Sequence, residues 1–168
     1  MLHGNDIAGS KCSASCRPKS NSERIPESGK MKIMVFTEGT TIRYTLKIPS
    51  GNAPAKLQKW KGQGAEIMYL TSRPKPDELD IVRHLLEQYD FPIGELFYRR
   101  EGEAYKDVAE RVLPDMLIED DCESIGGEVE MTYPHIKPEL KTRIKSIVVK
   151  EGGGIDHLPD NLVDLTKY

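Results

Sequence analysis

The sequence lacks most of the features that would place it outside the ordinary globular proteins. It has three cysteines, and Cys122 alone lies beyond the first thirty residues, which argues against a disulfide framework and fits a reducing compartment. No apolar run approaches the roughly 20 residues that a membrane-spanning helix needs. Residues 1–16 also lack the apolar stretch of a signal peptide. We therefore expect a cytoplasmic protein with no membrane partner.

A strong excess of one charge is also missing. The formal net charge is -3 over 168 residues, so nothing in the composition predicts nucleic acid as a partner. Apolar residues make up 38% of the chain, which is enough for a core in one domain. Residues 1–30 are rich in Ser, Gly, Pro, Asn and Lys and have no helical or strand period. They are predicted to be a disordered leader, and residues 31–168 to be the folded domain.

Short apolar runs alternate with amphipathic segments from Met31 onward. The apolar runs predict strands, and the segments with apolar residues three or four apart predict helices. The predicted strands are 32–36, 66–71, 94–99, 115–120 and 146–150. The predicted helices are 53–61, with Asn52 as its N-cap, 77–89, 103–113 and a short one within 158–165. This order predicts an α/β domain, a doubly wound, Rossmann-like parallel sheet with helices on both faces.

Polar residues follow the predicted strands at the edge where such sheets bind ligands. The first strand is followed by Glu38, Gly39 and Thr40, the second ends in Thr71 and Ser72, and a later one ends in Asp120 and Asp121. Lys106 lies in the first turn of a predicted helix. Hydroxyls, backbone N–H groups and a lysine can hold phosphate oxygens, and clustered carboxylates can hold Mg²⁺.

Each of these residues also has an ordinary structural explanation. Thr71, Ser72 and the two aspartates are typical capping residues, Glu38 is a common turn residue, and most helix lysines are solvated. It is the combination, at successive strand ends, that favours a phosphate site.

In this order the motifs resemble the haloacid dehalogenase-like (HAD-like) superfamily of phosphatases. EGTT (38–41) is similar to the end of the family's first motif, IMYLTSRP (67–74) to the second, and YKDVAERVLPDMLIEDD (105–121) to the third and fourth joined. The resemblance implies that Thr71, Ser72, Gly39 and Thr40 bind the substrate, and that Asp120 and Asp121 bind Mg²⁺. Because only the short segment 42–51 separates the first motif from the first helix, no large cap domain is expected.

The first motif departs from the family pattern. Aligning Glu38-Gly39-Thr40 with the family's Asp-Gly-Thr places Phe36 at the nucleophilic aspartate and Glu38 at the acid/base aspartate. A phenyl ring cannot attack phosphorus, so the covalent route is closed. Response-regulator receivers use similar parts, but their acidic pair precedes the lysine, whereas here it follows Lys106.

Two hypotheses follow from the sequence. The first is a Mg²⁺-dependent phosphate-ester hydrolase of low activity, with Glu38 and Lys106 as its catalytic residues. The second is a catalytically inactive domain that binds a phosphorylated small molecule or a protein.

Overall fold

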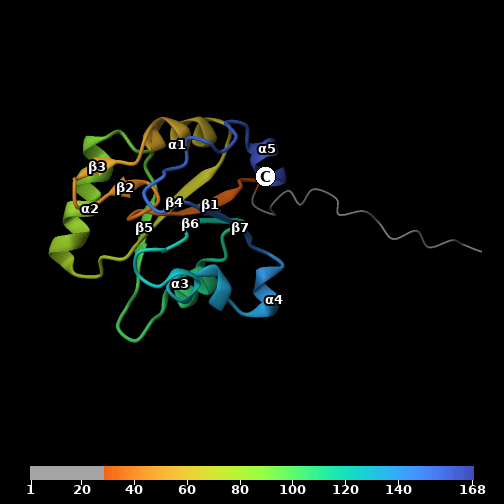
Figure 1. The fold of residues 1–168 in the computed structure, drawn as a ribbon. Coiled ribbons are helices and arrows are strands. Elements are labelled where there is room, and N and C mark those ends of the chain that lie inside the picture. The colour runs from red at the N-terminus through yellow and green to blue at the C-terminus, as the bar shows by residue number, and fades with distance from the viewer. Residues whose placement is uncertain (1–28) are drawn as a thin grey trace, which may run out of the picture.

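A computed structural model describes residues 29–168, which fold around one parallel sheet with helices on both faces (Figure 1). The five strands are β1 (Lys32–Phe36), β4 (Glu66–Thr71), β5 (Glu95–Tyr98), β6 (Met116–Asp120) and β7 (Lys145–Val149). Their order across the sheet is β5-β4-β1-β6-β7, and all neighbours are parallel. The predicted α/β class is thereby confirmed. The prediction for residues 1–28 lies outside the described residues.

Alternate residues of the central strands face opposite layers of the core, as strand geometry requires. Ile33, Val35 and their neighbours pack against α1 (Ala53–Gly62), α2 (Pro76–Gln88) and α5 (Leu162–Lys167). Met34 and Phe36 belong to the opposite core with α3 (Tyr105–Val112), and α4 (Pro138–Lys141) packs against this core. Figure 1 shows α1 above the sheet, and α3 and α4 below it.

Several local predictions need correction. The chain between β1 and α1 forms a small antiparallel hairpin, β2 (Ile42–Arg43) and β3 (Ile48–Pro49), which the sequence pattern did not indicate. The side chain of Asn52 forms no capping hydrogen bond, although Asn52 stands at the N-cap of α1. Its backbone N–H instead donates to both carboxylate oxygens of Asp156, at 2.8 and 2.9 Å. The last helix begins at Leu162 rather than near Leu158.

Two short 3-10 helices, η1 (Gly127–Val129) and η2 (Tyr133–His135), also lie between β6 and α4. The Glu119 carboxylate, 2% exposed, accepts the backbone N–H groups of Thr132 and Tyr133 and fixes the start of η2. Burial raises the pKa of Glu119, although the hydrogen bonds from Thr132 and Tyr133 oppose the rise. None of the described helices is long and apolar enough to cross a membrane.

Candidate functional site

The Glu38 carboxylate, just beyond the carboxyl end of β1, is the centre of a hydrogen-bond network. It accepts the hydroxyl protons of Thr37 and Thr71, each at 2.7 Å. The backbone N–H of Ser72 donates to Glu38 Oε2 at 2.8 Å, and the Ser72 hydroxyl lies 3.2 Å from the same oxygen. We call these donors of Thr37, Thr71 and Ser72 the Glu38 cradle. The structure thus brings Glu38, Thr71 and Ser72 together, as the sequence predicted.

The Thr71 hydroxyl has a fixed direction within the cradle. Its oxygen accepts the backbone N–H of Arg73 at 3.1 Å, so its own proton is free to point toward Glu38. The Thr37 and Thr71 side chains are almost fully buried. Donors that could hold an external phosphate therefore already hold a carboxylate of the chain itself. The binding of substrate by Thr71 and Ser72 stays a prediction.

Gly39 and Thr40 connect the Glu38 cradle to the carboxyl end of β6. The Thr40 hydroxyl donates to Asp120 Oδ1 at 2.9 Å. Gly39 has a φ of +79°, and a Cβ added there would lie 2.6 Å from Asp120 Oδ1. Only glycine fits this turn, because an L side chain would be both strained and in collision with the carboxylate. Thr40 therefore positions Asp120 and Gly39 leaves room for its carboxylate, and the predicted contact of both residues with substrate stays a prediction.

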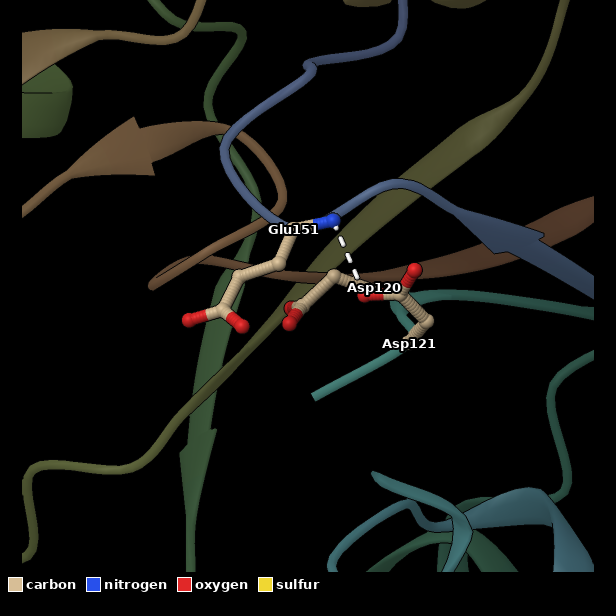
Figure 2. Close-up of side chains that lie close together, drawn as sticks. All are labelled: Asp120, Asp121 and Glu151. Carbon is tan, nitrogen blue, oxygen red and sulfur yellow. Dashed lines mark hydrogen bonds between the residues drawn. The ribbon is translucent and has the colours of Figure 1, made fainter. Parts of the chain in front are cut away.

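Three carboxylates converge beyond β6 and β7, and we call them the acidic trio: Asp120, Asp121 and Glu151 (Figure 2). One oxygen of each lies within 4.8 Å of the others. The backbone N–H of Glu151 donates to Asp121 Oδ1 at 3.1 Å, which ties the loop after β7 to the end of β6. Burial raises the pKa of Asp120, and the charge of Glu151 adds to the rise, whereas the Thr40 hydrogen bond opposes it.

Glu151 is the member of the acidic trio that sequence reasoning missed. It lies 30 residues from Asp121 and just beyond the last strand. The same rule that selected Asp120 and Asp121, that polar residues after parallel strands meet at one edge, would have selected it.

An open cavity of about 690 Å³ reaches the acidic trio through Glu151, the one member of the trio that lines it. Its lining includes Gly39, Arg43, Tyr44, Lys150 and Glu151. The guanidinium of Arg43 donates to the carbonyl of Gly152 at 3.2 Å. The hairpin β2–β3 is thereby connected to the loop after β7, and a positive charge lies on the cavity wall.

Lys150 is a second positive charge at this cavity. Its ammonium pairs with Glu123 and lies 3.8 Å from Asp121 Oδ2. Because Lys150 is largely exposed, it neutralises the acidic trio only in part.

Phe36 is buried at the end of β1, with 8% of its surface exposed. Its ring meets that of Tyr105 edge to face, with 5.0 Å between the centroids. Burial raises the pKa of the Tyr105 phenol, and the Arg99 guanidinium opposes this rise. Position 36 is therefore a packed aromatic contact with no group that could attack a phosphate or bind a metal.

Lys106 does not belong to the network around Glu38 and Asp120. Within residues 29–168 its one ion pair is with Asp107, at 4.0 Å. It lines a separate small cavity with Ala104, Val129 and His135. The site therefore forms from Thr71, Glu38 and Asp120 without a contact from Lys106, and the catalytic role of this lysine stays a prediction.

Comparisons with known proteins do not support the family resemblance. No family model matches the chain, and no curated protein matches it. Among solved structures, a universal stress protein in complex with cAMP is similar, at 13% identity, with 72% of this chain and 95% of that chain covered and a TM-score of 0.36. A likeness of this size carries no argument about the activity of the chain.

The identification of the chain as HAD-like is therefore corrected. The solved structure belongs to a different α/β family, and no model of the HAD-like family matches. Without that family, nothing in the comparisons supports a hydrolase or phosphatase activity for this chain. The physical reason is that threonines and acidic residues after parallel strands, and a lysine in a first helical turn, occur in many doubly wound sheets. The residue most diagnostic of the family, an aspartate at position 36, is absent.

Proposed function

We propose that the protein binds a phosphorylated small molecule together with Mg²⁺ and performs no chemistry at position 36. The observation that supports this proposal is the convergence of Asp120, Asp121 and Glu151 within 4.8 Å of one another, with Glu151 lining a cavity.

The acidic trio has the chemistry of a site for a hard divalent cation. Mg²⁺ prefers oxygen ligands and uses one or two carboxylates, keeping several waters or substrate oxygens. Asp120 is oriented by the hydroxyl of Thr40, and Asp121 by the backbone N–H of Glu151. Two of the three carboxylates are thus fixed before any cation arrives, which lowers the entropy lost on binding.

A phosphate group fits the remaining coordination positions of such a cation. Carboxylates and phosphate repel each other unless a metal lies between them. The cavity provides the space for the ligand, and Arg43 and Lys150 add positive charge on its wall. A phosphorylated small molecule is therefore favoured over a neutral one.

Phe36 is the reason to propose binding without catalysis. Its ring is packed against Tyr105, so the space that a nucleophile would need is filled with carbon. The carboxylate of Glu38 already accepts hydrogen bonds from the cradle donors, so it is not free to act on a ligand.

The cytoplasm is also the compartment that we propose, because few cysteines are typical of proteins in reducing surroundings.

Calorimetry with Mg²⁺ alone, and then with AMP in the presence of Mg²⁺ or EDTA, tests the proposal. We expect Asp120→Asn to weaken Mg²⁺ binding by about tenfold or more, and AMP to bind only when Mg²⁺ is present. Asp164→Asn, an exposed aspartate of α5, is the control and should leave both affinities unchanged.

Two outcomes contradict the proposal. Equal Mg²⁺ affinities of Asp120→Asn and Asp164→Asn would show that the acidic trio does not bind the cation. Sustained phosphate release from AMP by the natural chain, lost in Asp120→Asn, would refute the absence of chemistry.

A further inference from the structure

A second cleft lies at the same edge of the sheet, between the loops after β4 and β5. It has a volume of about 540 Å³, and we call it the β5 cleft. Its walls combine apolar rings and cationic side chains. The rings are Pro74, Pro76 and Tyr98, and the cationic side chains are Lys75, Arg99 and Arg100.

Arg99 is a charged group of the cleft whose side chain forms no hydrogen bond within residues 29–168. Its guanidinium lies over the ring of Tyr105, 4.1 Å from the centroid, which holds it in place through a cation–π contact. Its Nε N–H is buried and has no hydrogen-bond partner. Within residues 29–168, Arg99 forms no ion pair with any carboxylate. Because Nε is buried, a ligand in the cleft would meet the terminal N–H groups of the guanidinium, which form no hydrogen bond in the part of the chain that the structure describes.

The carboxylates near the β5 cleft neutralise its cations only in part. Glu103 accepts the backbone N–H of Arg100 at 2.9 Å and pairs with Arg111 at 3.4 Å, so its charge is already engaged. Glu78 pairs with Arg73 at 3.7 Å. Glu101 lines the cleft and Asp77 lies in the first turn of α2, and these two exposed acids are the remaining negative charges.

The start of α2 adds to the preference for an anion. Lys75 is its N-cap and Pro76 its first residue, and both line the β5 cleft. The positive end of the helix dipole therefore faces the same space as Arg99, although Asp77 and Glu78 in the first turn offset part of it. The fork of a guanidinium matches two oxygens of a phosphate, and the apolar walls match a flat ring.

We propose that the β5 cleft binds an aryl phosphate, with its phosphate on Arg99 and Lys75 and its ring against Tyr98 and the two prolines. The site is separate from the acidic trio and needs no metal. The same chemistry is offered by a free aryl phosphate and by a phosphotyrosine side chain of another protein.

Titration of the full chain with phenyl phosphate in EDTA, followed by NMR or calorimetry, tests this assignment. We expect Arg99→Met to weaken binding by about tenfold or more, and Arg99→Lys to weaken it less because the charge remains. Arg143→Met is the matched control, because Arg143 is an exposed arginine near the amino end of β7 and should leave binding unchanged. Asp120→Asn should also leave it unchanged, which separates this site from the proposed Mg²⁺ site.

Comparing the affinities of several ligands shows which source of the aryl phosphate fits the cleft and which results contradict the proposal. A phosphotyrosine peptide that binds at least as tightly as phenyl phosphate supports a protein ligand, and its exclusion supports a free aryl phosphate. If inorganic phosphate binds as tightly as phenyl phosphate, the apolar walls contribute nothing to binding and the assignment of an aryl ligand is wrong. Equal affinities of Arg99→Met and Arg143→Met would overturn the proposal, as would no binding to the natural chain.

Discussion

The two ends of one sheet edge carry opposite charges. Beyond β6 and β7 lie Asp120, Asp121 and Glu151, whereas Arg73 and Arg99 follow β4 and β5. The parallel topology is the same for both halves, because every strand directs its carboxyl end to this edge. The comparison shows that topology supplies the place for a ligand, and that the residues just after each strand determine which ligand charge it favours.

The halves also differ in how their charges are held. Backbone and hydroxyl donors position the carboxylates of the acidic half, and Lys150 offsets them only from an exposed position. In the basic half, rings hold the guanidinium groups: Arg73 lies over Tyr44 and Arg99 over Tyr105. Glu38 stands between the halves and is satisfied by neutral donors.

The largest expected effect comes from the centre of the edge. Glu38→Ala leaves the buried Thr71 hydroxyl and the Ser72 N–H without their acceptor, and leaves the Thr37 hydroxyl only its bond to the Leu70 carbonyl, at 3.3 Å. The free energy of unfolding should therefore fall by about 2–3 kcal/mol. Glu66→Ala, at the opposite end of β4, should change it little. Urea denaturation measures both, and equal values would show that the Glu38 cradle adds nothing to the stability of the fold.

A matched pair of glycines compares the halves directly. Gly39 and Gly102 have φ values of +79° and +78°, but an added Cβ meets Asp120 at 2.6 Å in the first case and nothing within 4 Å in the second. Gly102→Ala should lower the free energy of unfolding by about 1–2 kcal/mol, because alanine only has to adopt a left-handed backbone there. Gly39→Ala should lower the free energy of unfolding further and should also weaken Mg²⁺ binding. Denaturation and calorimetry test this, and equal losses would refute the close approach of Gly39 to Asp120.

The pH dependence of stability should reveal the acidic half. Burial raises the pKa of Asp120 in the folded protein above its ordinary value of 3.8. As pH rises between these two pKa values, the unfolded chain releases the proton before the folded one, so stability in EDTA falls with rising pH. Mg²⁺ should oppose this fall by favouring the ionised carboxylate.

Asp120→Asn is the comparison for that pH series. The variant should show a shallower decline in Tm across the same window, with Glu119, whose pKa is also raised, accounting for part of what remains. Identical pH profiles of the variant and the natural chain would exclude Asp120 as the source.

The smallest effect is expected for Lys150. Its ammonium lies 3.8 Å from Asp121 and competes with a cation, so Lys150→Met should raise Mg²⁺ affinity about threefold, as expected for an exposed pair. Lys145→Met, at the amino end of the same strand, should have no effect. Calorimetry distinguishes them, and weaker Mg²⁺ binding in Lys150→Met would contradict the competition.

Most of the fold could be predicted because its strands are locally encoded. The apolar runs at 32–36, 66–71 and 115–120 lie within one residue of β1, β4 and β6. The hairpin β2–β3 was missed because each of its strands has only two residues, too few for a period to appear. The start of α5 was placed too early because Leu158 is buried in the preceding loop and imitates a helical apolar position.

The site was predictable only in part. Glu38, Thr71 and Asp120 were found from their places after strands, but the Glu38 cradle was not, because a carboxylate and a bound phosphate attract the same donors. The assignment of Lys106 to the site rested on its order in the chain. Chain order does not fix which way a side chain on α3 points, and the structure gives this lysine Asp107 as its ion partner.

The sequence by itself determined the strands of the main sheet, most of the helices that cover it and the polar residues at the strand ends, because period and composition are local properties of the chain. Only the tertiary structure decided which of those residues meet. Glu151 joins Asp120 because β7 pairs with β6, and Thr71 reaches Glu38 because β4 pairs with β1. Strand order arises from packing of the whole core. No local pattern could therefore show that the acidic and the basic residues would lie at opposite ends of one sheet edge.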